Sequence, residues 1–277
     1  MTRNPYTLIA TMLALLLTFI NTHADSRSVD TLSGSQTHKP TQAVAHQGWH
    51  TKDGGTSHNS CAAVRNAFAA GFYGCEIDVH QTTDGHIIVN HDASIGGVTI
   101  NLSTYDQVKD LTLSNGERLP QLSDMLAIMT DEYPDSPTKL VIELKVNANT
   151  DTLRLARSVV QAVRDADLQD RVEYISFGLS ACRYVRATDP TAVVQLLTAM
   201  PPAVARDNDL QGIDYNYKAY LNNPIWISEA RQMGLIINVW TIDDEATIAQ
   251  FCDLGVDYIT SNHPDLVQQI SHKIIEN

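Results

Sequence analysis

The sequence predicts a single-domain (β/α)8 barrel, and two observations support this. Eight short apolar runs alternate with helical segments from residue 43 onward, and this alternation is typical of a parallel sheet covered by helices. Polar side chains recur at the carboxyl ends of these runs, where the loops of such a barrel meet at one mouth. A chain of 277 residues is long enough for one large domain, although length alone does not exclude two.

The predicted strands are of two kinds. Residues 75–80 alternate in polarity, whereas residues 139–145 are nearly continuous in apolar residues, as buried parallel strands are. The remaining predicted strands are residues 43–46, 172–176, 193–197, 212–215, 235–241 and 257–260. Helices are predicted from capping residues and apolar spacing at residues 60–70, 122–129, 151–166, 181–188, 225–233 and 245–254, with a further helical start at residues 103–106.

Residues 1–24 are predicted to be a signal peptide that precedes the barrel. Arg3 supplies the positive charge, residues 8–20 are almost wholly apolar, and small residues follow at the positions that a signal peptidase reads. The apolar run is short for a membrane span. We therefore expect a periplasmic or secreted protein with no stable span after cleavage, and an uncleaved N-terminal anchor is the alternative. Residues 25–41 are expected to be a flexible lead-in to a barrel at residues 42–277.

The charge and the cysteines restrict the possible partners and cross-links. A formal charge of -13 argues against nucleic-acid binding, which requires basic patches. Export would permit disulfides among Cys61, Cys75, Cys182 and Cys252, and sequence does not choose among the three possible pairings. A bridge between Cys61 and Cys75 is one possibility, and buried free thiols are the other.

Residues 74–92 predict a strand and a return strand that carry charged groups on one face. Side chains of a strand alternate between two faces, so Glu76, Asp78 and His80 share one face and apolar residues take the other. The return strand ends at His91. Two neighbouring carboxylates are costly unless a positive group lies between them, so a divalent cation is one interpretation. A hairpin with polar residues on its solvated face is the other.

Chemistry-bearing residues lie at or just past the carboxyl ends of several predicted strands. They are His46, Glu76, Asp78, Glu143, Lys145, Asp214 and Trp240. Because the carboxyl ends of barrel strands converge on one mouth, we expect these side chains to form an active site there.

Several short motifs follow one another in a fixed order. They are His46-Gln47-Gly48, Asn59-Ser60, Glu76-Ile77-Asp78-Val79, Thr83-Asp84-Gly85, Val89-Asn90-His91-Asp92, Leu119-Pro120-Gln121-Leu122, Ile142-Glu143-Leu144-Lys145, Asn238-Val239-Trp240-Thr241, Gly255-Val256-Asp257 and His263-Pro264. In this combination the chain resembles the glycerophosphodiester phosphodiesterases, metal-dependent barrel enzymes of the wider phosphatidylinositol-phospholipase-C-like group. The resemblance covers about residues 43–270.

The resemblance implies a role for each matching position. The metal ligands would be Glu76, Asp78 and Glu143, the catalytic residues His46 and His91, and the phosphate-binding lysine Lys145. Two further residues are expected to bind substrate: Gln47, at the place of a family arginine, and Trp240, as an apolar wall for the alcohol part, with core packing of Trp240 as the alternative. The cation would be Ca²⁺ or Mg²⁺, because an all-carboxylate site suits hard cations. One histidine would act as general base and the other as general acid, in an order that sequence does not decide.

The chain departs from the family pattern at three places. Gln47 stands where the family has an arginine, which predicts weaker phosphate binding or a changed substrate, and His58 stands where it has a glutamate. The loop at residues 93–97 is short and no large insertion precedes Glu143, so we expect a reduced cap over the mouth. An open mouth is compatible with a bulky or polymeric substrate.

Three functions are therefore considered. The first is an exported, metal-dependent enzyme of lipid metabolism that hydrolyses small-molecule glycerophosphodiesters to glycerol 3-phosphate and an alcohol. The second is a phospholipase-D-like lyase or a hydrolase that acts on lysophospholipid or polymeric glycerophosphate. The third is a catalytically weak relative that only binds phosphodiesters, which Gln47 favours and the intact set of carboxylates and histidines disfavours.

Overall fold

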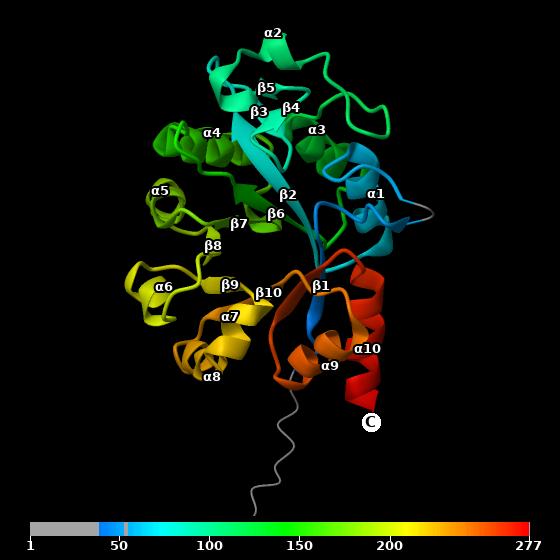
Figure 1. Ribbon diagram of the computed structural model, residues 1–277, viewed down its shortest axis with the longest axis vertical. Helices are drawn as coiled ribbons and strands as arrows, with labels where there is room; N and C mark the ends of the chain where they lie inside the picture. The colour runs from blue at the N-terminus through cyan, green and yellow to red at the C-terminus, as the bar shows by residue number, and fades with distance from the viewer. Residues whose placement is uncertain (1–38, 53–54, 277) are drawn as a thin grey trace, which may run out of the picture. The chain divides into compact units, whose positions relative to one another are not determined.

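Eight parallel strands form a closed barrel in the computed structural model, which describes residues 39–52 and 55–276. The ring closes because β1 (Gln42–Ala45) pairs with both β2 (Gly74–Gln81) and β11 (Tyr258–Ser261). Between β2 and β11 the order of strands is β6 (Lys139–Leu144), β7 (Val172–Ser176), β8 (Val193–Leu196), β9 (Gly212–Asn216) and β10 (Ile236–Trp240). The predicted (β/α)8 barrel is confirmed, and each of the eight predicted strands is present (Figure 1).

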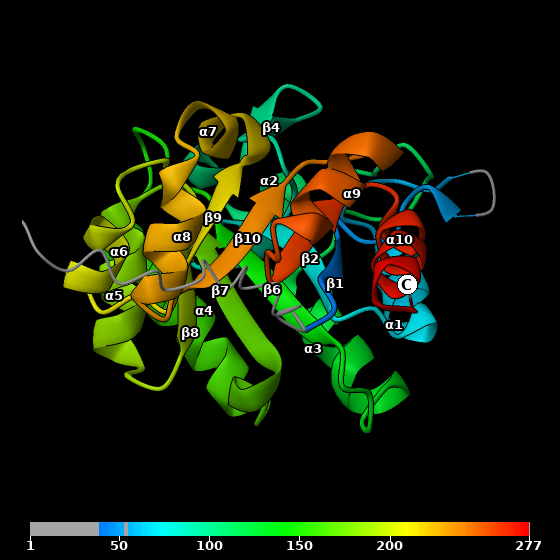
Figure 2. The same ribbon diagram turned by 90° about the horizontal axis from the view of Figure 1, so that it is seen from below.

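Helices follow the strands and lie around the barrel (Figure 2). They are α1 (Cys61–Ala70), α4 (Thr152–Asp165), α5 (Leu179–Thr188), α6 (Ala203–Asp207), α7 (Tyr217–Asn222), α8 (Ile225–Gln232), α9 (Glu245–Asp253) and α10 (Pro264–Glu276). The helix α1 begins where Ser60 accepts a hydrogen bond from the Ala63 amide and ends at Gly71 in the left-handed conformation, as the capping pattern predicted. The sequence did not predict α6, α7 and α10.

The two faces of the barrel strands have different environments. Outward-facing residues such as Cys75, Ile77 and Ile142 pack with the helices in one large apolar cluster. Inward-facing residues such as Val44 and Val141 form a smaller apolar cluster inside the ring. Because side chains alternate along each strand, the same strands also direct polar groups toward the interior.

A small lobe lies between β2 and β6. It contains β3 (Ile87–Val89), β4 (Ser94–Ile95), β5 (Val98–Thr99), η3 (Ile100–Leu102), α2 (Tyr105–Val108), α3 (Leu122–Ala127) and the π-helical turn η4 (Ile128–Glu132). Part of it packs around its own apolar cluster of Ile88, Ile100, Val108, Leu113 and Leu119. This lobe occupies the position of the expected cap, and its reduction relative to other family members stays a prediction.

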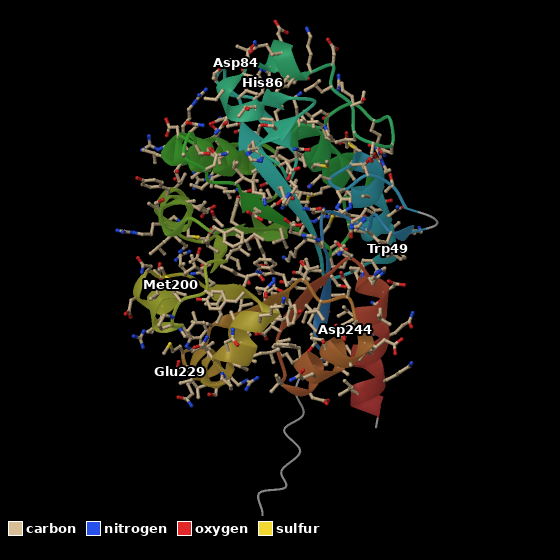
Figure 3. The ribbon with its side chains drawn as sticks, viewed as in Figure 1. Trp49, Asp84, His86, Met200, Glu229 and Asp244 are labelled. Carbon is tan, nitrogen blue, oxygen red and sulfur yellow. The ribbon has the colours of Figure 1, made fainter. Side chains whose placement is uncertain are left out.

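The lobe is attached to the turn that follows β2. Asp84 accepts hydrogen bonds from the Tyr105 amide at 2.9 and 3.1 Å, and His86 stacks on the Tyr105 ring at 4.2 Å (Figure 3). His86 therefore has a structural role in the lobe.

The four cysteines are all free in the structure, so the buried-thiol alternative holds and a Cys61–Cys75 bridge is absent. Burial raises the pKa of Cys61 and of Cys252 to about 11, which keeps both thiols protonated. The predicted signal peptide and most of the predicted lead-in lie outside the described residues. Within the part of the chain that is described, no helix has the length and apolar character of a membrane span.

Candidate active site

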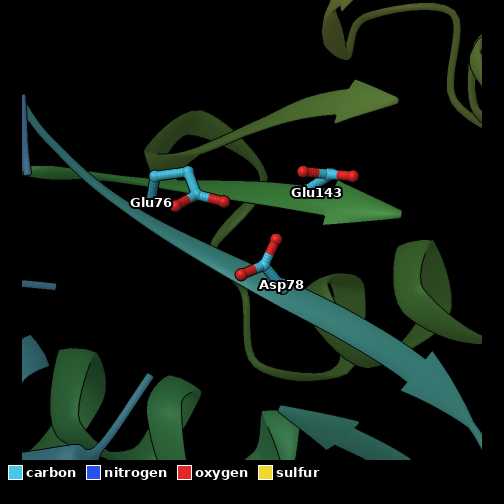
Figure 4. A group of neighbouring side chains, drawn as sticks. All are labelled: Glu76, Asp78 and Glu143. Atoms are coloured by element: carbon cyan, nitrogen blue, oxygen red, sulfur yellow. The ribbon is translucent and has the colours of Figure 1, made fainter. Parts of the chain in front are cut away.

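Three buried carboxylates meet inside the mouth of the barrel. Glu76 and Asp78 lie two residues apart on β2, and Glu143 on β6 pairs in register with Asp78. Strand alternation places all three on the inner face, where they point toward one another (Figure 4). One oxygen of each lies within 4.8 Å of the others, and the residues are 3%, 1% and 7% exposed. This group is called the acidic cluster below.

Lys145 is the only lysine or arginine that the structure pairs with the acidic cluster in the described part of the chain. Its Nζ lies 2.9 Å from Asp78 Oδ1 and 3.0 Å from Glu143 Oε2. Burial alone would raise the pKa of Asp78, but Lys145 and Asn59 hold it below its usual value. Burial raises the pKa of Glu143 to about 7, and burial together with Asp78 and Glu143 raises the pKa of Glu76. One ammonium group therefore leaves the cluster short of positive charge.

Different polar groups contact the two oxygens of the Asp78 carboxylate. Asp78 Oδ2 accepts hydrogen bonds from Asn59 Nδ2 at 2.8 Å and Gln47 Nε2 at 3.0 Å. The Asp78 amide in turn donates to Asn59 Oδ1 at 3.0 Å. Asp78 Oδ1 contacts the Lys145 ammonium instead, so a cation at Oδ1 would share this oxygen with Lys145. Asn59 orients the carboxylate rather than only beginning a helix.

Gln47 is part of the wall of the acidic cluster. Its backbone amide donates to Glu76 Oε2 at 2.8 Å, and its side chain joins Asp78 to His58, whose Nδ1 lies 2.5 Å from Gln47 Oε1. The residue is 5% exposed. Both ends of the Gln47 side chain are therefore hydrogen-bonded to protein groups. A contact between this side chain and substrate phosphate would have to replace or share one of these hydrogen bonds.

His46 is held by Asn262, which follows the last barrel strand. Asn262 Oδ1 lies 2.9 Å from His46 Nδ1 and 3.0 Å from His50 Nε2, while Asn262 Nδ2 donates to Asp243 Oδ2 at 2.8 Å. A carboxylate only accepts hydrogen bonds, so Asp243 fixes the orientation of the Asn262 amide. Asn262 Oδ1 then faces both imidazoles and accepts from each. His46 therefore carries its proton on Nδ1, which leaves Nε2 as an acceptor.

Burial lowers the pKa of His46 below 6.5, and the Asn262 hydrogen bond opposes this shift only in part. His91 has a different environment. Its side chain is 55% exposed, and its Nδ1 lies 2.9 Å from Asp92 Oδ1. Asp92 therefore accepts a hydrogen bond from the Nδ1–H of His91, which leaves Nε2 free to face a substrate.

Two cavities meet at these histidines, since His46 and His91 line both of them. The first, called the inner cavity, has a volume of about 120 Å³ and is also lined by Glu76, Glu143, Lys145 and Trp240. The second, called the outer cleft, has a volume of about 560 Å³ and lies against the small lobe. Trp240 donates from Nε1 to the Asp214 carbonyl at 2.9 Å and packs edge-to-face on Phe177, forming an apolar wall.

The structure brings the predicted site residues together at one mouth. His46, Glu76, His91, Glu143, Lys145 and Trp240 line the inner cavity, and Asp78 and Gln47 lie beside it. His80 is buried, with Nε2 3.3 Å from the His91 carbonyl, so it supports the His91 loop. Sequence reasoning missed Asn262, Asp243 and His50. The position of Asn262 directly after β11 is the signal that could have found it.

The fold and this site define a barrel enzyme with a buried acidic centre and two histidines. Residues 46–266 match the model of the glycerophosphoryl diester phosphodiesterase family. The chain belongs to that family and is a phosphoric diester hydrolase.

Solved structures and curated relatives agree with this assignment. A glycerophosphodiester phosphodiesterase from Parabacteroides distasonis is 34% identical with a TM-score of 0.81, covering 86% of this chain and 99% of that one. A phosphodiesterase from Oleispira antarctica, solved with the product sn-glycerol-3-phosphate, is 21% identical with a TM-score of 0.73, covering 83% and 96%. A glycerophosphodiester phosphodiesterase from Caldanaerobacter subterraneus is 22% identical over 84% of this chain and 98% of its own length.

Proposed function

We propose that the protein hydrolyses glycerophosphodiesters to glycerol 3-phosphate and an alcohol, with a divalent cation at the acidic cluster and with His46 and His91 as base and acid. The observation that carries the proposal is that one small cavity is lined by carboxylates of the cluster, Lys145 and both histidines. A phosphodiester placed there would meet positive charge at its oxygens and a proton carrier on either side.

The acidic cluster fits a hard cation. Its donors are carboxylate oxygens, as Ca²⁺ and Mg²⁺ prefer, and each residue offers one oxygen within 4.8 Å of the others. The raised pKa of Glu76 reflects burial and unbalanced negative charge, which a cation would relieve. When bound, such a cation withdraws charge from a phosphoryl oxygen and stabilises the transition state. Lys145, shared between Asp78 and Glu143, would add a fixed positive charge for the phosphate.

The two histidines are suited to opposite tasks. His46 holds its proton on Nδ1 toward Asn262, and burial lowers its pKa, so its free Nε2 suits a general base. It would take a proton from water as the water oxygen bonds to phosphorus. His91, as imidazolium, would give a proton from Nε2 to the departing oxygen as the bond from that oxygen to phosphorus breaks. The products are a phosphomonoester and a neutral alcohol. His46 then releases its proton to solvent and His91 takes one up from solvent, which restores both histidines.

One assay tests the proposal. The protein would be incubated with glycerophosphocholine and with lysophospholipid, with Ca²⁺, with Mg²⁺, or with chelator. Release of glycerol 3-phosphate that chelator abolishes is the expected result, and a cyclic phosphate product would indicate a lyase instead. His91→Ala should reduce turnover by at least about 100-fold, the smaller contribution typical of a positioned acid or base. Near-normal turnover in His91→Ala would contradict the assigned role, and no turnover with either cation would leave a binding protein.

We also propose that the protein is exported. The supporting observation is the charged start, apolar run and small residues of residues 1–24. N-terminal sequencing of the protein from its native host checks this, because cleavage after residue 24 is expected and an intact N-terminus would contradict it.

A further inference from the structure

The outer cleft is an unassigned cavity beside the candidate active site. It adjoins the inner cavity at His46 and His91, which line both. The rest of its wall comes from the segment before α1, the segment after β3, and the small lobe. The residues that this wall contributes are Ser57, His58, Asn90, Asp92, Thr112 and Ser114.

The volumes of the two cavities restrict where the parts of a diester can lie. The inner cavity, at about 120 Å³, is below the roughly 300–1,000 Å³ that is typical of pockets for drug-sized ligands. The outer cleft, at about 560 Å³, is within that range. A small constant group fits the inner cavity, whereas a group of variable size needs the cleft.

The chemistry of the walls also indicates that the glycerol phosphate lies in the inner cavity and the alcohol in the outer cleft. The inner cavity holds the groups suited to phosphate, and its side wall has apolar rings together with Asp214, whose Oδ1 has no hydrogen-bond partner among the described residues. This carboxyl oxygen can accept a hydrogen bond from a hydroxyl of glycerol, and the rings cover the carbon atoms.

The charge of the outer cleft is one-sided. The residues that line it include the carboxylate of Asp92, several hydroxyl and amide groups, and the apolar side chains of Ile95 and Leu113. None of the described residues that line it is a lysine or an arginine. Asp92 carries the one fixed charge among the described residues of the wall, and its neighbour His91 becomes neutral once it has given its proton to the departing oxygen. An anionic alcohol would therefore leave against a carboxylate with no lysine or arginine among the described residues of the wall, whereas a cationic alcohol would be attracted.

We infer that the outer cleft binds the departing alcohol of the diester and selects cationic or uncharged polar alcohols over anionic ones. This inference rests on the proposed function. It places the bond that breaks beside His91, whose neighbours Asn90 and Asp92 belong to the cleft wall. It also places glycerol in the inner cavity, on the opposite side of the phosphorus.

The test uses three diesters of glycerol phosphate that differ only in the alcohol. These alcohols are choline, its neutral isostere with carbon in place of the quaternary nitrogen, and a hydroxy acid of similar length. We expect kcat/KM to be about two- to fivefold higher for choline than for the isostere, the range of an exposed ion pair, and lower for the hydroxy acid than for either. Ratios between substrates cancel the part of a variant's effect on the chemical step that the three alcohols share, and Thr112→Lys, which leaves the hydrogen bond between His91 and Asp92 in place, gives the cleaner ratio.

Two variants and one control localise the effect. Asp92→Asn should abolish the preference for choline over the isostere. Thr112→Lys adds a positive charge at an exposed position in the cleft wall. It should raise the kcat/KM of the hydroxy-acid diester, relative to that of the isostere diester, about two- to fivefold. Gln161→Lys adds the same charge on the outer face of α4, beside Asp165, and should leave both ratios unchanged.

The outcomes separate the inference from the function it rests on. If all three diesters are hydrolysed but neither Asp92→Asn nor Thr112→Lys changes the ratios, the alcohol lies elsewhere and the inference is wrong. If Gln161→Lys shifts the ratios as much as Thr112→Lys does, the effect comes from net charge and the inference is equally wrong. If none of the diesters is hydrolysed, the proposed function itself fails.

Discussion

Gln47 Oε1 accepts a hydrogen bond from His58 Nδ1 at 2.5 Å, so the two residues that replace the family's arginine and glutamate contact each other. The other end of the Gln47 side chain donates to Asp78. The two departures from the family pattern therefore lie in contact, and we interpret them as a single exchange.

This contact predicts that the two positions must be changed together. In Gln47→Arg alone, a guanidinium has no acceptor to offer the exposed His58 ring, and the lost hydrogen bond costs about 0.5–1.5 kcal/mol. We expect a lower free energy of unfolding and no decrease in KM. The double variant Gln47→Arg/His58→Glu restores a pair, so it should recover stability and lower KM for the diester. Chemical denaturation and steady-state kinetics measure both. A lower KM in the single variant, with unchanged stability, would mean that Gln47 already faces the phosphate.

The hydrogen bond from His46 to Asn262 predicts a positioning role for Asn262. Asn262→Ala removes the acceptor that fixes the Nδ1 proton of His46, so kcat should fall at least about tenfold, part of the 10²–10⁴-fold that a positioned acid or base contributes, with little change in KM. Nitrogen NMR should show His46 changing from the Nδ1–H tautomer to a mixture. His86→Gln, which changes a histidine of the lobe, is the matched control. An unchanged tautomer would contradict the role even if activity fell.

The lowered pKa of His46 predicts the acid limb of the pH profile. A general base must be deprotonated, so kcat/KM should persist below pH 6.5 and be lost as the pH falls through the lowered pKa. Asp78, His50 and His91 also act on this imidazole. Asn262→Asp would place a carboxylate at Nδ1 and raise the pKa, so the limb should move to higher pH. A limb that stays in place in Asn262→Asp would assign it to another group.

The acidic cluster predicts that cation binding and stability are linked. Glu143→Gln removes one of three crowded carboxylates, so the cation-free variant should be more stable than the wild type. The stabilisation by added Ca²⁺ or Mg²⁺, about 2.7 kcal/mol at a hundredfold excess over Kd for one site, should largely disappear. Thermal unfolding with and without cation measures this. Glu229→Gln on the outer helix α8 is the control (Figure 3). Equal stabilisation of wild type and Glu143→Gln would place the cation elsewhere.

Gly48 is predicted to tolerate no side chain. A Cβ there would lie 2.7 Å from Ala63 Cβ and 2.8 Å from Ala63 C, and its φ is +76°. Gly116 has a similar φ of +83° with open space around it, so Gly116→Ala carries only the backbone strain. Gly48→Ala should lower the free energy of unfolding by more than Gly116→Ala, which should cost about 1–3 kcal/mol. Equal losses would show that the loop after β1 shifts to accept the methyl group.

Sequence was sufficient for the ring of strands and for the acidic cluster, because both depend on local alternation. Glu76 and Asp78 share a face by spacing alone, and the run that contains Glu143 reads as a neighbouring buried strand. Asn262 was missed because its contact with His46 joins residues 216 positions apart. Likewise, nothing local shows that His58 reaches Gln47. Such pairings depend on how loops from different strands approach each other at the mouth.

The length of strand β2 is fixed by the burial of both of its faces. All eight of its residues are buried, with one side chain in two facing the helices and the next facing the acidic cluster. Losing or gaining a single residue would exchange the two sets, placing carboxylates against the apolar helices and methyl groups at the mouth. Among relatives of this protein, we therefore expect amino-acid substitutions within β2, and insertions or deletions only after it, in the lobe.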